Sequence, residues 1–264
     1  MAKRLGQLES AALAYAQMRS LRQIAQGELS ENLGITPRQE RDLLGRMARR
    51  GLIARVRRGL YLFPPRLPLG GVWTPDEATA VNALMEDCGA TYQITGPNAF
   101  ERYGFDEQIP ARLFIYNDAL SGERSIGQVN LTLIKVASDR LGSTESVERP
   151  DGQTLVFSSR ERTLVDAVYD WSRFDTLPRA FGWIRRDIEN GGTEPKALVK
   201  VALQFGNQGA IRRVGVVLEE LGVDESLLRR LSRALRSTTS QIPFDPTRPK
   251  RGPINKRWGV ARND

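Results

Sequence analysis

The chain has 264 residues, of which 40% are hydrophobic and 27% are charged, the composition of a globular protein. At roughly 100–200 residues per domain, this length favours two domains. The single cysteine, Cys88, excludes an internal disulfide and a cysteine-rich zinc site, and the lack of histidine excludes imidazole-dependent hydrolase mechanisms. Because no apolar run approaches about 18 residues, we expect a cytoplasmic protein that does not enter a membrane.

Positive charge is concentrated at the two ends of the sequence. The formal net charge is +8, and it divides into +7 for residues 1–65, −7 for residues 66–228 and +8 for residues 229–264. Basic ends favour a polyanionic partner such as nucleic acid, whereas the acidic middle is typical of a region with another role. A highly charged solvated surface is the alternative interpretation.

The first 50 residues predict three helices. Apolar residues at three- and four-residue spacing indicate a helix over residues 5–18, and Gly34 ends a short second helix because glycine tolerates the left-handed conformation. The segment Thr36-Pro37-Arg38-Gln39 is a capping box that opens a third helix reaching about Arg50. Two helices joined by a short glycine-containing turn are the layout of a helix-turn-helix.

A β-hairpin is predicted directly after the third helix. Strand-like runs at residues 52–56 and 60–63 flank Arg57-Arg58-Gly59. A hairpin at this place corresponds to the wing of a winged helix-turn-helix, with two arginines at its tip.

The third helix is predicted to have an apolar face and a basic face. Leu43, Leu44 and Met47 fall together on a helical wheel and are expected in the core. The residues expected at DNA are Thr36, Arg38, Gln39, Arg41, Asp42, Gly45, Arg46 and Arg49 of this helix, with Arg57 and Arg58 of the wing. Arginine matches guanine edges and phosphates, aspartate accepts from cytosine, and glycine permits close backbone approach. A solvated arginine-rich helix is the alternative.

The stretch of residues 64–72 is rich in proline and glycine, which predicts a linker between a winged helix-turn-helix domain of residues 1–63 and a second domain of residues 73–264. Capping signals at residues 74–77 and 158–161 open helices, and β-rich runs lie between them. Further helices are predicted at residues 177–189, 195–205, 208–221 and 225–235. The predicted fold class is α+β, with a helical second half in the larger domain.

The last segment, residues 238–264, is basic but carries apolar residues. Lys250, Arg251, Lys256 and Arg257 supply its charge. A disordered basic tail is the alternative, but Ile254 and Trp258 among these cations favour a segment that packs on the second domain and presents its basic side.

Four segments in this order resemble the AbiEi family of bacterial type IV antitoxins: residues 28–65, 92–100, 162–166 and 250–260. The resemblance implies that the winged helix represses the antitoxin's own operon at inverted repeats. It also implies that the second domain counteracts a nucleotidyltransferase toxin encoded beside it, without requiring a stable complex, in phage defence. Lys250, Arg251, Lys256 and Arg257 are the candidates for the antitoxin surface.

No motif for a cofactor, a metal or a catalytic nucleophile is present. Asp166 and Asp170 are interpreted as solvent-facing charges, and Ser158-Ser159 as a helix cap. We therefore expect no cofactor, no metal and no turnover. The alternative is a nucleic-acid-processing enzyme in which the winged helix targets residues 73–264 to perform metal-dependent phosphoryl transfer.

Overall fold

A computed structural model describes residues 5–66 and 71–263 of the chain. They form two compact units: the first contains the residues up to 92 together with 111–138 and 148–155, and the second contains residues 93–110, 139–147 and those from 156 onward. Both units contain helices and strands, and the long run of helices falls in the second half of the chain, so the predicted α+β class is confirmed. The predicted linker at residues 64–72 includes residues 67–70, which lie outside the described residues.

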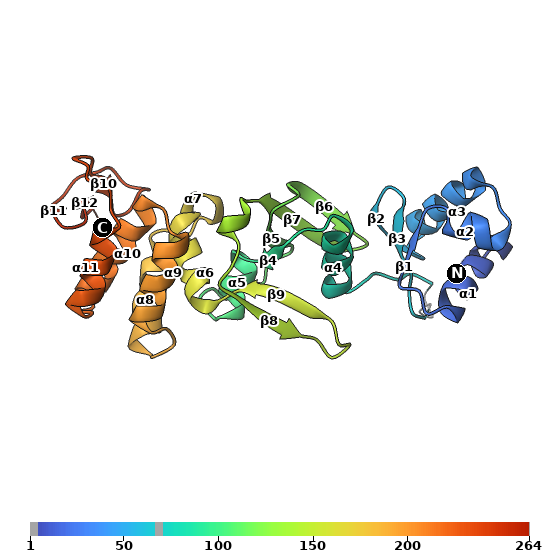
Figure 1. The fold of residues 1–264 in the computed structure, drawn as a ribbon, viewed down its shortest axis with the longest axis horizontal. Coiled ribbons are helices and arrows are strands. Elements are labelled where there is room, and N and C mark those ends of the chain that lie inside the picture. Colours follow the sequence, from blue (N-terminus) through green and yellow to red (C-terminus); the bar gives the residue numbers. More distant parts are fainter. Residues whose placement is uncertain (1–4, 67–70, 264) are drawn as a thin grey trace. The chain divides into compact units, whose positions relative to one another are not determined.

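The first unit begins with a winged helix, drawn in blue to cyan in Figure 1. Its elements are α1 (Gln7–Met18), β1 (Gln23–Ala25), α2 (Glu28–Leu33), α3 (Pro37–Arg49), β2 (Ala54–Arg57) and β3 (Leu60–Leu62). The three strands form an antiparallel sheet in the order β1-β3-β2. The sequence did not indicate β1, because three residues are too few for an alternating pattern. Its pairing with β3, such as Ile24 opposite Tyr61, defines it.

The predicted start of α3 is confirmed in detail. Gly34 has a φ of 62° and ends α2. The backbone N–H of Gln39 then donates to Thr36 Oγ1 over 3.2 Å, and the backbone N–H of Thr36 donates to Gln39 Oε1 over 2.8 Å. A cap of this kind contributes about 1 kcal/mol to helix stability.

The predicted apolar face of α3 is also confirmed. Leu43, Leu44 and Met47 have no exposed surface. They share one core with Ile24 of β1 and Leu29 of α2. This packing leaves the opposite side of α3 outside the core.

The rest of the first unit contains one helix and three complete strands among the described residues. These are α4 (Glu77–Asp87), β5 (Leu113–Asn117), β6 (Gly122–Ile126) and β7 (Val129–Lys135), in which β7 pairs in parallel with β5 and antiparallel with β6. The cap of α4 is Asp76, whose Oδ1 accepts from the backbone N–H of Thr79 over 2.9 Å. Thr74, the first residue of the predicted capping signal, instead accepts from the backbone N–H of Gln128 over 2.8 Å.

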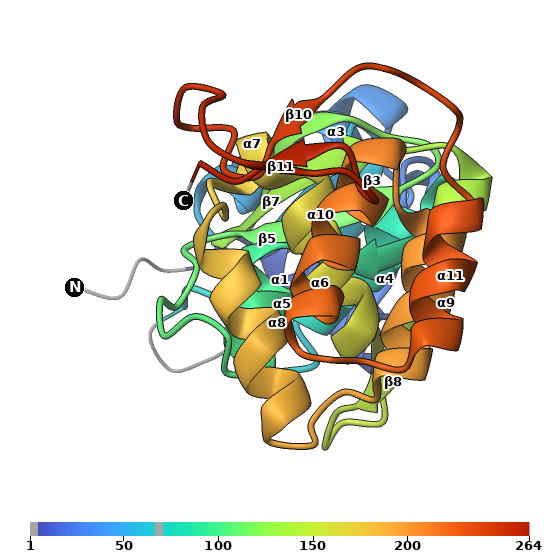
Figure 2. The same ribbon diagram turned by 90° about the vertical axis from the view of Figure 1, so that its left-hand side faces the viewer.

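The second unit is mostly helical. Its helices are α5 (Pro97–Arg102), α6 (Arg160–Tyr169), α7 (Trp171–Phe174), α8 (Arg179–Glu189), α9 (Pro195–Phe205), α10 (Gln208–Glu220) and α11 (Glu225–Arg233). Most residues of strands β4 (Tyr92–Ile94), β8 (Thr144–Glu148) and β9 (Thr154–Ser158), and of the short 3-10 helix η1 (Ser138–Arg140), also belong to it. Figure 2 shows α10 between α8 and α11, with which it packs.

The cap of α6 lies one residue later than the predicted capping box would place it. Ser159 Oγ accepts from the backbone N–H of Arg162 over 3.2 Å. Ser158 is fully buried and accepts from Gln93 Nε2 over 2.7 Å. Ser158 therefore belongs to the core, and Ser159 alone caps the helix.

The interpretation of Asp166 as a solvent-facing charge is wrong. Asp166 has no exposed surface, and its two oxygens accept from Arg162 Nε over 2.8 Å and from Arg140 Nη2 over 2.6 Å. The Arg162 guanidinium also lies 3.9 Å from the ring centre of Phe205, and that of Arg140 lies 3.8 Å from Tyr169. This group, called the Asp166 cluster below, joins α6 to the segment before β8.

The C-terminal segment packs on the second unit, as predicted. Its strands β10 (Ile242–Pro243), β11 (Ile254–Asn255) and β12 (Val260–Ala261) form a small sheet in the order β10-β12-β11. Trp258 and Phe244 are each 1% exposed and anchor it, whereas Ile254 is 44% exposed and does not. A Cβ at Gly215 of α10 would lie 2.5 Å from the Trp258 ring, so only glycine admits the ring there.

Candidate nucleic-acid interface

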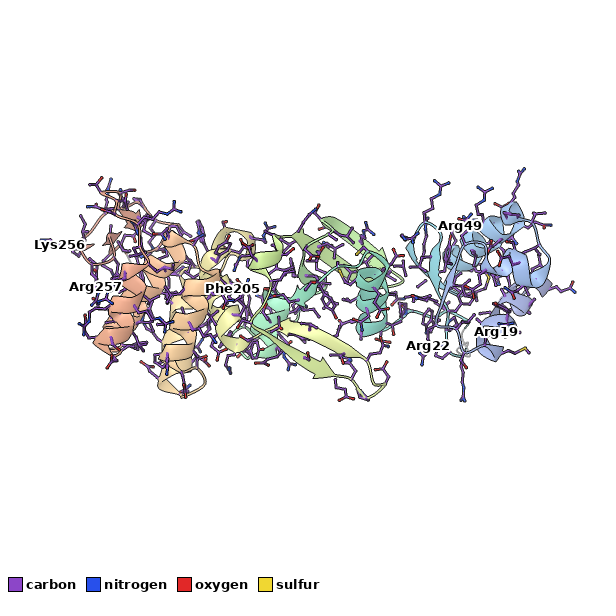
Figure 3. The ribbon with its side chains drawn as sticks, viewed as in Figure 1. Arg19, Arg22, Arg49, Phe205, Lys256 and Arg257 are labelled. Atoms are coloured by element: carbon purple, nitrogen blue, oxygen red, sulfur yellow. The ribbon has the colours of Figure 1, made fainter. Side chains whose placement is uncertain are left out.

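The side of α3 that faces away from the core carries four exposed arginines. We call Arg38, Arg41, Arg46 and Arg49, with Asp42 and Gly45 between them, the α3 arginine face. All of them except Arg38 line a shallow hollow of about 230 Å³, and Arg49 is labelled in Figure 3. The hollow exists because Gly45 has no side chain; a Cβ there would lie 3.6 Å from Arg49 Nη1.

The charge of this face is largely uncompensated. Within residues 5–66 and 71–263, Arg38, Arg41, Arg46 and Arg49 form no ion pair. The next arginine along the chain, Arg50, differs because it pairs with Glu9 of α1. The four guanidiniums therefore present a positive surface to solvent, and the charge of Arg46 also contributes to lowering the pKa of Glu9.

Thr36 and Gln39 were also predicted at DNA, but their side chains are engaged elsewhere. They hydrogen-bond to each other, with 3.0 Å between Thr36 Oγ1 and Gln39 Oε1, and to each other's backbone. They hold the first turn of α3 in place, next to Arg38.

A buried carboxylate that the sequence analysis missed orients α3. Glu40 has no exposed surface and accepts from the backbone N–H groups of Gly27 and Leu29 over 2.8 and 3.0 Å. These donors belong to the start of α2, where backbone N–H groups have no partner within the helix. Glu40 lies on the same wheel side as Leu43 and Leu44, which is the signal that identifies it.

The two predicted wing arginines lie in different environments. Arg57 Nη2 donates to Asp87 Oδ1 of α4 over 2.6 Å, and this hydrogen bond raises the pKa of Arg57 and lowers that of Asp87. Arg58 is exposed and, in the described part of the chain, has no such partner.

The sequence analysis missed a third arginine of the wing, Arg55, which is exposed on β2. The alternation of Ala54-Arg55-Val56-Arg57 is the signal that was overlooked. No wing residue lines the hollow on α3.

The four candidate cations of the C-terminal segment divide in a similar way. Arg257 donates to both oxygens of Glu225 over 2.9 Å each, and its hydrogen bond lowers the pKa of that carboxyl. Lys250 donates to the carbonyl of Gln241 over 3.2 Å. Arg251 and Lys256 are exposed, and Figure 3 shows Lys256 at the outer edge of the segment and Arg257 beside α11.

No described group of three or more acidic, cysteine or histidine side chains is arranged to hold a metal ion. Among the described helices, none is both long and apolar enough to cross a membrane. Cys88 is half-buried at the end of α4 and donates to the carbonyl of Leu84 over 3.2 Å.

The helices and hairpin of the first 66 residues fit the class of winged helix-turn-helix proteins. Residues 20–64 match the family model described as "Transcriptional regulator, AbiEi antitoxin", which confirms the resemblance for the winged-helix segment. The other three segments that carry the resemblance lie outside the matched residues. The match supports a role as an antitoxin or transcriptional regulator and covers most of the winged helix. No curated protein matches the chain in sequence.

A solved structure shares the architecture. The "Crystal structure of RV2827C protein from Mycobacterium tuberculosis" is similar over 98% of this chain and 92% of that chain, with a TM-score of 0.61 and 14% identity. At this identity the similarity concerns the fold alone.

Proposed function

We propose that this chain is a DNA-binding autorepressor and antitoxin of a bacterial type IV toxin–antitoxin system. The observation that carries the proposal is the α3 arginine face, with four unpaired guanidiniums around a glycine on a capped helix. The family match over residues 20–64 supports the same role. In this proposal the protein works by binding, without turnover, in the cytoplasm.

In the proposed complex, α3 lies in the major groove of operator DNA. Arg38 and Arg49 are placed to reach base edges or phosphates, and Asp42 to accept from a cytosine amino group. Gly45 lets the helix approach the groove closely. Inverted repeats in the operator then require two copies of the chain, one for each half-site.

The wing makes the sequence-independent contacts in this proposal. Arg55 and Arg58 are its unpaired cations among the described residues, so they are the ones free to approach phosphates. Arg57 is less available for contact with phosphates, because its guanidinium donates to Asp87. Its expected contribution to DNA binding is therefore smaller than that of Arg58.

The antitoxin role belongs to the second unit in this proposal, and its target is a nucleotidyltransferase toxin encoded by the same operon. The exposed cations Lys250, Arg251 and Lys256 are the proposed antitoxin surface, and Arg257 holds that surface against α11. An anchored segment loses less entropy on binding than a free tail does. Phage defence is the proposed biological setting.

The decisive experiment measures operator binding and toxin neutralisation on the same variants of the full chain. Arg38→Ala and Arg49→Ala are expected to weaken operator binding by about 1–3 kcal/mol and to relax base preference where the arginine reads a base edge. Arg19→Ala, which removes an exposed arginine after α1, is the matched control. Fluorescence anisotropy on operator and scrambled duplexes measures the first activity, and growth rescue measures the second.

Wild-type operator affinity in both α3 variants would reject the proposed interface. Loss of operator binding with full growth rescue is the expected pattern. Loss of both activities in folded α3 variants would mean that neutralisation needs the winged helix, against the proposed division of roles.

A further inference from the structure

The hollow on α3 contains a carboxylate that stays apart from the guanidiniums around it. Asp42 lies four residues after Arg38 and four residues before Arg46, a spacing at which opposite charges commonly pair on a helix. Asp42 is nevertheless exposed and forms no ion pair with any residue that the structure describes. Its oxygens are therefore open to a donor from outside the protein.

Gly45 brings one guanidinium to the same hollow. Side chains of a helix lean towards its N-terminus, so Arg49 extends back over Gly45, one turn earlier. Arg49 Nη1 lies 3.6 Å from where a Cβ of Gly45 would be. Gly45 in turn follows Asp42 by three residues, which places both on one side of α3. An acceptor and a donor thus border one hollow of about 230 Å³ without the contact of an ion pair.

One kind of base pair presents a matching order of groups in the major groove. A C·G pair offers the cytosine amino group as a donor, followed by O6 and N7 of guanine as acceptors. A T·A or G·C pair would place a carbonyl oxygen against the carboxylate, which leaves two acceptors without a donor. An A·T pair keeps an amino donor, but its thymine presents one acceptor and a methyl group in place of the two acceptors of guanine.

We propose that the hollow reads one C·G base pair as a unit, with Asp42 accepting from the cytosine amino group and Arg49 donating to the guanine of the same pair. The inference rests on the proposed DNA-binding role and adds the base pair that decides the sequence preference. Asp42 also acts by exclusion, because on other sequences its negative charge faces phosphates or base acceptors. Arg38 does not line the hollow and contacts another position of the half-site.

The test starts from a duplex that the full chain selects from a random library. Each base pair of this duplex is replaced in turn, and affinities are measured by fluorescence anisotropy at a fixed salt concentration. Wild type is expected to lose about tenfold in affinity when one particular C·G pair is changed to any other pair. Asp42→Asn is expected to lose this preference and to favour A·T there, because the asparagine amide matches N6 and N7 of adenine.

Two further variants separate reading of the base pair from folding. Gly45→Ala fills the hollow with a methyl group at ordinary contact distance from Arg49, and alanine is the better helix former. This variant is expected to stay folded and to bind the selected duplex about tenfold more weakly. Arg38→Ala is the matched control, which is expected to weaken binding but to keep the preference for the C·G pair that Asp42 reads. Circular dichroism of each variant reports on folding.

Three results would overturn the inference. The first is a selected duplex in which Asp42→Asn changes the preference at no base pair. The second is wild-type affinity in Gly45→Ala. The third is equal binding of an RNA duplex of the same sequence, whose deep and narrow major groove does not admit a helix. A wild-type chain that selects no sequence, or that binds selected and scrambled duplexes alike, would instead reject the proposed operator recognition itself, and this inference with it.

Discussion

The α3 arginine face and the Asp166 cluster both consist of arginines, but the first exposes their charge and the second buries it. On α3, four exposed guanidiniums have no ion pair among the described residues. In the Asp166 cluster, the guanidiniums of Arg140 and Arg162 are held by one fully buried carboxylate and stacked on aromatic rings. The first arrangement leaves charge available to a partner, and the second uses it within the fold.

The C-terminal segment lies between these extremes. Arg213 of α10 donates to the carbonyl of Phe244 over 3.0 Å, and burial lowers the pKa of Arg213 to about 10. Arg257 is tied to Glu225, while Lys256 is exposed. The comparison shows that a count of basic residues overstates the charge that a partner meets, because tertiary contacts neutralise part of it.

The largest expected effect is at the Asp166 cluster. Asp166→Ala leaves two guanidiniums without their carboxylate, and removing one partner of a buried ion pair typically costs about 3–5 kcal/mol. The free energy of unfolding, measured by chemical denaturation, is expected to fall by this amount. Asp139→Ala, at an exposed acidic position of η1, is the control. Equal stability of the two variants would contradict the structural role given to the cluster.

The second effect concerns the buried carboxylate that orients α3. Glu40→Ala leaves the backbone N–H groups of Gly27 and Leu29 without their acceptor, and each buried unsatisfied group costs about 1–3 kcal/mol. Both stability and operator affinity are expected to fall, although Glu40 is not exposed to DNA. Glu31→Ala, at an exposed position of α2, is the control. Full operator affinity in Glu40→Ala would show that α3 keeps its orientation without this hydrogen bonding.

A third experiment compares the two wing arginines. The slope of the logarithm of operator affinity against the logarithm of salt concentration is expected to become shallower by about one in Arg58→Ala, because this variant removes one cation from a DNA phosphate. Arg57→Ala is expected to change the slope less, because the Arg57 guanidinium is held by Asp87. The reverse order would mean that Arg57 leaves Asp87 when DNA binds.

The smallest expected effect is a pH-dependent loosening of the C-terminal segment. The hydrogen bond from Arg257 holds the pKa of Glu225 below its ordinary value. This interaction therefore stabilises the fold above the unfolded pKa of about 4.3, and the stabilisation disappears as the pH falls through the lower folded value. Hydrogen exchange of the amides near Trp258 is expected to speed up in that acidic range, and Glu225→Gln to show the faster exchange already at neutral pH. Identical exchange in wild type and Glu225→Gln would mean that Glu225 does not help to hold the C-terminal segment in place.

Local signals in the sequence determined the winged helix. These signals act within one or two helical turns, so they can be recognised in the sequence without a structure. They are Gly34, the Thr36–Gln39 capping box and the spacing of Leu43, Leu44 and Met47. The anchoring of the C-terminal segment by Trp258 followed from its apolar character alone, although Ile254 proved exposed.

Only the tertiary structure decided which charges are free. Asp166, Glu40 and Arg57 meet partners that lie 4, 11, 13, 26 or 30 residues away along the chain, and nearly all of these interactions join different elements. The partner of a charged side chain depends on how the elements pack, whereas a cap or an apolar stripe depends on residues within one element. For this reason the sequence identified the basic helix, and the fold decided that its arginines remain unpaired while those around Asp166 do not.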